Sequence, residues 1–222
     1  MFSSRSRGVA LRFLMRRGGK RQVLKIARGT ACLFFDFFAG RWYNKNMERA
    51  TDNLILIGMP ACGKSTAGVL AAKTLGYGFI DSDLVIQTQE KKLLSEIIEE
   101  RGMEGFIDVE NRVNAAIWAE RCVIATGGSV IYGAEAMEHL KSIGSVIYLK
   151  VSFEEIERRL GNIILGRGVV IRRGESLRDL YDERVPLYEK YADYTIDCDA
   201  HGVEETVHAV CALAEKIGDK RE

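Results

Sequence analysis

The chain contains few of the residues that build disulfide frameworks, metal cages or membrane spans. Among its 222 residues are two prolines, three histidines without ligand spacing and five scattered cysteines without a C-x-x-C pair. This cysteine usage argues against a disulfide scaffold or a zinc site and favours a reducing, cytoplasmic location. An apolar piece at residues 31–39 is too short to span a bilayer and is interrupted by Asp36. The length supports one well-buried domain.

Charge is balanced overall but unevenly distributed along the chain. The sequence holds 32 basic and 31 acidic residues, yet residues 1–50 carry 12 basic residues and only two acidic ones. The remainder therefore has 20 basic against 29 acidic residues. This contrast divides the chain into a basic leader, residues 1–46, and a domain at residues 47–222.

The basic leader, which we expect to be disordered, is open to several interpretations. Met47 could be the true start, because residues 47–52 run directly into the first predicted strand. In that case the leader would have no function. The leader is also rich in arginine, contains serine and is poor in acids, as organelle transit peptides are. A basic arm with aromatic residues could instead bind RNA or an anionic membrane. For the domain itself we expect a monomer that binds a small molecule and neither nucleic acid nor membrane.

The most informative stretch is residues 58–66, Gly-Met-Pro-Ala-Cys-Gly-Lys-Ser-Thr. It follows the apolar run Asn53–Ile57 and opens a helical pattern at 67–73, which is the strand–G-x-x-x-x-G-K-[ST]–helix context of a phosphate-binding P-loop. Glycines let the backbone wrap round a phosphate while the N–H groups at the helix start point inward. The stretch therefore predicts a nucleoside-triphosphate site.

Each residue type in this loop suits a part of MgATP. Lys64 can reach the β- and γ-phosphate oxygens, and the Ser65 hydroxyl can ligate Mg²⁺. The predicted nucleotide-binding residues are Gly58, Ala61, Cys62, Gly63, Lys64, Ser65 and Thr66.

Short apolar runs alternate with helix-period segments from residue 53 onward. The predicted strands are Asn53–Ile57, Gly78–Ile80, Cys122–Ala125, Ser145–Leu149 and Tyr194–Asp197. The predicted helices lie near 63–75, 92–101, 105–120, 134–142, 153–160, 176–192 and 203–217, and Ser152 with Glu155 is typical of a capping box. The alternation indicates an α/β fold whose parallel sheet is sandwiched by helices. Right-handed crossovers place the loops after the strands along one edge, where we expect the chemistry.

Polar residues follow two of these strands. Asp81 and Asp83 come after the second strand; one could hold Mg²⁺ while the other accepts a proton from a substrate hydroxyl, although either could simply cap a helix. Gly127 and Gly128 follow the third strand and let the backbone approach a ligand, although an ordinary turn would look the same.

Two arginine-containing segments complete the candidate site. Residues from Arg158 to Gly174 are rich in arginine and glycine, which predicts a mobile lid at about 160–175 that closes over triphosphate charge, with a solvated basic loop as the alternative. Arg184 lies in an acid-rich helical segment and could clamp a substrate carboxylate or pair with a neighbouring acid.

Taken as an ordered set, these motifs resemble the shikimate kinase family, within the wider group of P-loop kinases similar to nucleoside-monophosphate kinases. The resemblance covers about residues 53–217. It includes Glu104-Gly105-Phe106, and Glu183 to Tyr188 followed by Tyr191-Ala192-Asp193. It implies a five-stranded parallel sheet of order 2-3-1-4-5.

The resemblance also implies MgATP-dependent phosphorylation of shikimate to shikimate 3-phosphate, a step of aromatic amino acid biosynthesis. It assigns Asp81 to the Mg²⁺ region, Asp83 to the substrate hydroxyl, Arg184 to the substrate carboxylate and Arg167 to the transferred phosphate. Lys64, Asp83 and Arg167 are then the catalytic residues, with Gly127 and Gly128 beside the substrate.

The sequence departs from the family pattern at two positions. Ile107 stands where the family has an arginine that helps to hold the shikimate carboxylate, and the family's three-glycine loop becomes Gly127-Gly128-Ser129. Arg112, about a turn and a half beyond Ile107, could substitute for that arginine. A kinase of another acceptor, such as homoserine, a sugar acid or a nucleotide, is one alternative. A non-catalytic nucleotide-binding module is another, although it would need none of Asp83, Arg167 and Arg184.

Overall fold

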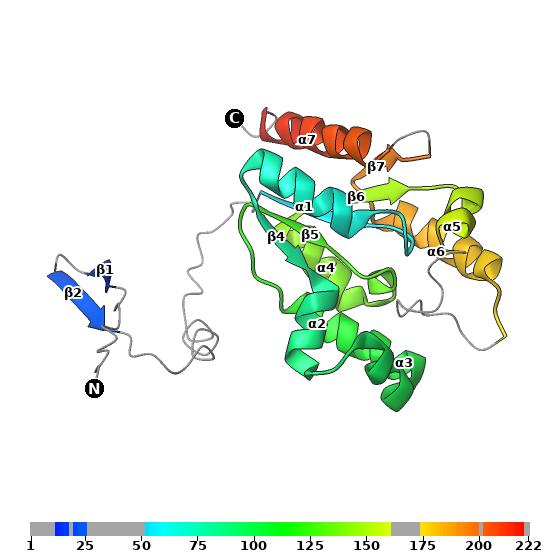
Figure 1. Ribbon diagram of the computed structural model, residues 1–222, viewed down its shortest axis with the longest axis horizontal. Coiled ribbons are helices and arrows are strands. Elements are labelled where there is room, and N and C mark those ends of the chain that lie inside the picture. Colours follow the sequence, from blue (N-terminus) through cyan, green and yellow to red (C-terminus); the bar gives the residue numbers. More distant parts are fainter. Residues whose placement is uncertain (1–11, 18–19, 26–51, 161–173, 200–201, 220–222) are drawn as a thin grey trace, which may run out of the picture. The chain divides into compact units, whose positions relative to one another are not determined.

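The computed structural model describes residues 12–17, 20–25, 52–160, 174–199 and 202–219 (Figure 1). The chain divides into two units, Met1–Glu48 and Arg49–Glu222. In the first unit, β1 (Arg12–Arg17) pairs antiparallel with β2 (Lys20–Lys25). No helix within the described residues is both long and apolar enough to cross a membrane.

The second unit is built on a sheet of five parallel strands. Its order is β4–β5–β3–β6–β7. The bounds are β3 (Asn53–Ile57), β4 (Gly78–Asp81), β5 (Cys122–Ala125), β6 (Gly144–Lys150) and β7 (Tyr194–Asp197). Numbered from β3 along the chain, this is the predicted order 2-3-1-4-5. The parallel sheet and its order are therefore confirmed.

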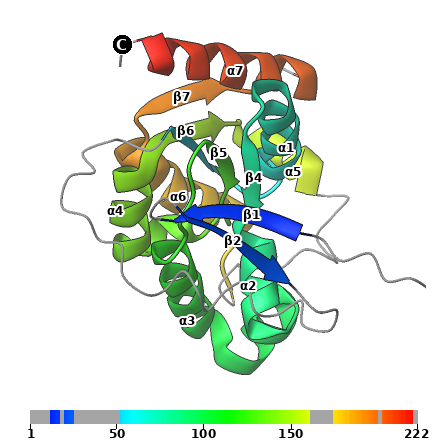
Figure 2. The same cartoon turned by 90° about the vertical axis from the view of Figure 1, so that its left-hand side faces the viewer.

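Helices cover both faces of the sheet (Figure 2). One face carries α1 and α7, and the other carries α4 and α6, with α5 packed against α6. The bounds are α1 (Lys64–Leu75), α4 (Ala134–Ile143), α5 (Phe153–Leu160), α6 (Leu177–Tyr191) and α7 (Val203–Asp219). All five residues of the central strand β3 are buried, as both faces of a sandwiched strand must be.

Two helices at the end of β4 differ from the sequence prediction. The helix α2 (Ser82–Glu90) was not predicted, and its first turn is capped by the side chain of Asp81. The segments predicted at 92–101 and 105–120 are one element, α3 (Leu94–Ala115), broken at Gly102, which has φ 69° and ψ −176°. The end predicted at residue 120 was wrong, because the helix stops at Ala115 and a short connection leads to β5.

Candidate active site

The predicted phosphate loop joins the end of β3 to the start of α1. Gly58, Ala61 and Gly63 all have positive φ, at 146°, 64° and 101°. At Gly58 a Cβ would lie 2.8 Å from the carbonyl oxygen of Leu149 in β6, so both the backbone angle and the packing require glycine. No side chain caps the first turn of α1, and no acidic residue lies in it. The helix start is thus left open to an anion.

Lys64 is the first residue of α1 and is buried under the loop. Its Nζ donates to the carbonyl oxygens of Gly58 at 2.7 Å and Met59 at 2.9 Å, and contacts Cys62 Sγ at 3.7 Å. The side chain therefore holds a positive charge at the centre of the loop. Ser65 and Thr66, on the same first turn, are exposed.

A pocket lies beside the phosphate loop, and its empty volume, which includes the open solvent at its mouth, is about 280 Å³. Its wall combines residues from the phosphate loop, α2, α3, the loop after β5 and α6. The lining residues are Pro60, Asp83, Leu94, Phe106, Glu110, Gly127, Gly128, Ser129 and Arg184. Four predicted substrate-binding residues, Asp83, Gly127, Gly128 and Arg184, are therefore brought together here.

Asp81 and Asp83 make different contacts at the end of β4. Asp81 Oδ1 accepts from the backbone N–H groups of Asp83 at 3.0 Å and Leu84 at 3.4 Å, which starts α2. Asp83 points into the pocket, where its Oδ1 lies 2.9 Å from the position of a Cβ on Gly127. Burial raises the pKa of Asp83, the charge of Asp81 raises it further, and Lys64 opposes the shift. Asp83 is therefore a stronger base than an ordinary aspartate.

Glu110 is a buried carboxyl group in the pocket wall that the sequence analysis did not select. It comes from α3, is 1% exposed, and its Oε2 accepts from the Ser129 hydroxyl at 2.5 Å. Its Oε1 has no hydrogen-bond partner among the described residues and lies against Gly127. Burial raises the pKa of Glu110 to about 7; Ser129 opposes the shift, Asp83 adds to it, and Arg184 and Lys64 oppose it.

Arg184 is a buried cation facing the same pocket. It is 1% exposed, its Nε donates to Tyr132 Oη at 3.3 Å, and its guanidinium lies 5.3 Å from the Tyr132 ring centre. One turn later on α6, Tyr188 Oη donates to the carbonyl oxygen of Gly128 at 2.5 Å. Tyr188 also stacks on Tyr148 of β6 at 5.2 Å. These aromatic contacts fix α6, and with it Arg184, against the Gly127–Gly128 loop.

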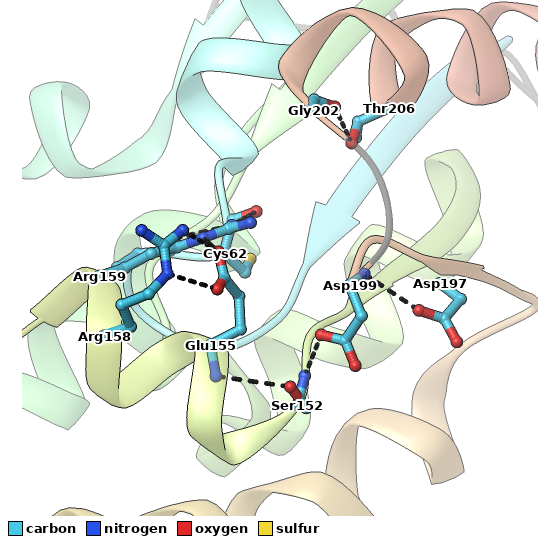
Figure 3. A network of polar contacts seen from close by, with 10 residues as sticks. Cys62, Ser152, Glu155, Arg158, Arg159, Asp197, Asp199, Gly202 and Thr206 are labelled. Carbon is cyan, nitrogen blue, oxygen red and sulfur yellow. Dashed lines mark hydrogen bonds and ion pairs between the residues drawn. The ribbon is translucent and has the colours of Figure 1, made fainter.

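On the other side of the phosphate loop, α5 contributes Arg159 (Figure 3). Arg159 Nη1 donates to the carbonyl oxygens of Ala61 and Cys62, each at 3.4 Å, while its Nε bonds Glu155. Arg158 bonds only Glu155 among these residues and is largely exposed. Arg159 thus links α5 to the loop.

The predicted capping box at the start of α5 is half correct. The N–H of Glu155 donates to Ser152 Oγ at 3.4 Å, as predicted. The N–H of Ser152, however, donates to Asp199 Oδ1 at 2.6 Å (Figure 3). The Glu155 carboxylate is engaged by the two arginines instead of reaching back.

The predicted lid falls largely outside the described residues. Residues 161–173, which include Arg167, are outside the described residues, whereas Arg158 and Arg159 belong to α5. Ile107 is half-buried and is not among the pocket-lining residues. Arg112 does not replace the arginine missing at 107, because its guanidinium is exposed and pairs with Glu90 Oε1 at 2.6 Å.

Glu110 did leave a signal in the sequence. It shares one helical face of α3 with Phe106, Val109, Val113 and Asn114, all buried. Apart from Asn114 this stripe is apolar, and burying a carboxyl group on it is costly, so Glu110 marks a candidate functional position. Only the packing of the loop after β5 shows that this face borders the pocket.

Both the sequence and the fold are similar to those of known proteins. The model of the shikimate kinase family matches residues 60–214. A shikimate kinase of Thermodesulfovibrio yellowstonii is 34% identical over 172 residues, covering 75% of this chain and 97% of its own length. One from Methylococcus capsulatus is 35% identical over 170 residues, covering 76% and 95%. Among solved structures, shikimate kinase from Acinetobacter baumannii in complex with shikimate has a TM-score of 0.62 and 33% identity, covering 78% of this chain and 93% of that one.

Proposed function

The chain belongs to the shikimate kinase family, and from that premise we propose that it transfers the γ-phosphoryl group of ATP to a hydroxyl group of shikimate. The observation that carries the proposal is the pocket beside the phosphate loop. It places a carboxyl group of raised pKa, Asp83, and a buried arginine, Arg184, on one small cavity. A hydroxy acid could place its hydroxyl group at Asp83 and its carboxylate at Arg184.

The phosphate loop fits a nucleoside triphosphate. Its positive-φ residues, the uncapped first turn of α1 and the buried Lys64 ammonium together offer an anion backbone N–H groups and a cation. The residues that would hold the phosphates are Gly58, Ala61, Cys62, Gly63, Lys64, Ser65 and Thr66. Lys64 would exchange carbonyl oxygens of the loop for phosphate oxygens, and its charge would stabilise the transferred group.

The residues that fit Mg²⁺ are Ser65 and Asp81. The described residues contain no group of three or more His, Cys, Asp or Glu side chains that could hold a metal, so oxygens of the phosphates and water would complete the shell. Bound there, Mg²⁺ would neutralise negative charge on the phosphate oxygens. Asp81 can take this part because only its Oδ1 caps α2.

Asp83 is the proposed general base. Its raised pKa lets it take the proton of the acceptor hydroxyl at neutral pH more readily than an exposed aspartate would. Arg184 would bind the acceptor carboxylate and so fix which hydroxyl faces Asp83. Arg167, outside the described residues, is proposed to contact the transferred phosphate.

The second candidate is a kinase for another small hydroxy acid, which Ile107 favours because one carboxylate-binding arginine is missing. A coupled ADP-release assay distinguishes the two. The chain should release ADP with shikimate and not with homoserine, gluconate or nucleoside monophosphates. Turnover of one of these with shikimate inert would overturn the acceptor assignment. Nucleotide binding without turnover of any of them would favour a non-catalytic module.

The base assignment has its own test. Asp83→Asn should lower kcat about 10²- to 10³-fold, because the amide cannot accept the proton, while the KM for ATP stays close to the wild-type value. Asp108→Asn, an exposed position on α3, is the control. An unchanged kcat in Asp83→Asn would contradict the assignment.

A further inference from the structure

Both departures from the family pattern converge on Glu110. Ser129, at the third position of the glycine loop, donates to Glu110 Oε2. Ile107 lies one helical turn before Glu110 on α3, a spacing from which an arginine could pair with the carboxylate and an isoleucine cannot. Glu110 is thus a buried carboxyl group that bonds an uncharged hydroxyl, that of Ser129, through Oε2. Its Oε1 has no hydrogen-bond partner among the described residues.

The charged groups around Glu110 come from several elements and act in opposite directions on its pKa. Asp83 on α2 disfavours the ionised form, whereas Arg184 on α6 and Lys64 on α1 favour it. From η1 (Val130–Tyr132), Tyr132 is engaged by Arg184. Burial is the largest influence, and it favours the neutral acid.

The titratable groups of α4, which packs on α3, are directed to other positions. Glu135 accepts from Asn111 at 3.4 Å, and the His139 ring contacts the carbonyl oxygen of Ile117 at 2.7 Å. Neither supplies a counter-charge to the Glu110 carboxyl group.

We propose that Glu110 is a specificity-determining residue that binds the acceptor as the neutral acid, donating a hydrogen bond from Oε1 to the acceptor carboxylate held by Arg184. This rests on the proposed function for the identity of the acceptor. Ser129 fixes the carboxyl group through Oε2, which leaves Oε1 as the oxygen without a hydrogen bond among the described residues, lying against Gly127 in the pocket wall. A neutral acid then takes the place of a second arginine. A carboxylate-bearing acceptor is favoured because its carboxylate accepts this hydrogen bond. If Glu110 were ionised, its charge would repel the same carboxylate.

The inference predicts a difference between two substitutions. Glutamine has nearly the size of glutamate and keeps a donor without a charge, so Glu110→Gln should reproduce the neutral acid. Alanine removes the donor, so the KM of Glu110→Ala for shikimate should lie about 10- to 100-fold above the wild-type value at acidic pH and should not change with pH. Asp108→Asn should behave as wild type.

The decisive measurement is the KM for shikimate against pH at saturating MgATP, made on the full chain. Wild-type KM should rise about tenfold per pH unit above about pH 7, as Glu110 loses its proton. KM of Glu110→Gln should stay flat, within about threefold of the wild-type acidic limb, with the KM for ATP unchanged. A flat wild-type profile, or a Glu110→Gln variant as weak as Glu110→Ala, would overturn the inference.

Infrared difference spectroscopy separates this inference from the proposed function, because it needs no acceptor. Wild type at neutral pH should show the carbonyl band of a protonated carboxyl group that Glu110→Gln lacks. Loss of that band at neutral pH would overturn the inference even if shikimate is phosphorylated. Failure to phosphorylate shikimate, with the band present, would instead remove the proposed function.

Discussion

The phosphate loop and the pocket that we assign to the acceptor are neighbours that share Pro60, yet they are assembled differently. The loop is one continuous stretch, residues 58–66, and its shape follows from local backbone angles. The pocket takes Asp83 from α2, Glu110 from α3 and Arg184 from α6, and each depends on packing between elements. Substitutions on the donor side should therefore act mainly on the use of ATP. Substitutions on the acceptor side should alter acceptor use alone.

The largest expected effect is on the donor side. Lys64→Ala removes the cation at the centre of the loop, and we expect kcat in the ADP-release assay to fall by at least about 10³-fold. Lys73→Ala, an exposed position on the same helix, serves as the control. Substantial residual turnover in Lys64→Ala would contradict the assignment of the loop to the triphosphate.

Arg184→Lys tests the acceptor side. The charge is kept but the two-pronged guanidinium is lost, so the KM for shikimate should rise about 10- to 100-fold with the KM for ATP nearly constant. Arg178→Lys on the exposed side of α6 is the matched control. If ATP and shikimate were affected equally in Arg184→Lys, the separation of the two sides would be wrong.

Arg159 gives a smaller effect that sharpens the comparison. Its two long bonds to Ala61 and Cys62 hold the loop from α5, so Arg159→Ala should raise the KM for ATP about three- to tenfold and leave the shikimate KM unchanged. Arg158→Ala loses only an exposed ion pair with Glu155 and should change neither value. Equal effects of the two substitutions would refute this role for Arg159.

The last prediction concerns stability and not turnover. The pKa of Glu110 is raised from 4.5 to about 7, so the folded protein binds this proton more tightly than the unfolded chain does. That stabilisation is fully present below pH 4.5 and is lost as the pH rises through about 7, by up to about 1.4 kcal/mol per pH unit. Urea unfolding of wild type and Glu110→Gln at a series of pH values should show this slope in wild type only. Glu104→Gln, at an exposed position, should keep it.

Much of the fold was predictable from local patterns. Buried strands of a parallel sheet appear as short apolar runs, and three of the five were placed with correct bounds: β3, β5 and β7. Prediction missed the helix α2, although the capping role that the sequence left open for Asp81 or Asp83 is confirmed at Asp81. It also failed for the end of α3, since nothing local marks Ala115 as its last turn.

The acceptor side was predicted less completely. Asp83, Gly127 and Gly128, which line the pocket, were selected because they follow strands, and Arg184 because it is an arginine in an acid-rich helical segment. Glu110 was missed because its significance depends on burial and on the loop after β5, which contribute no signal to the helix that carries it.

The sequence by itself determined the donor side, because a phosphate loop is a property of consecutive backbone angles and of one lysine at fixed spacing. It also determined the sheet and the edge at which the chemistry lies. Only the tertiary structure decided the acceptor pocket. It turned Arg112 outward to Glu90, buried Arg184 against Tyr132, and brought Glu110 beside Asp83 and Ser129. Burial and the sum of nearby charges set the protonation of these groups, and both depend on residues far apart in the chain.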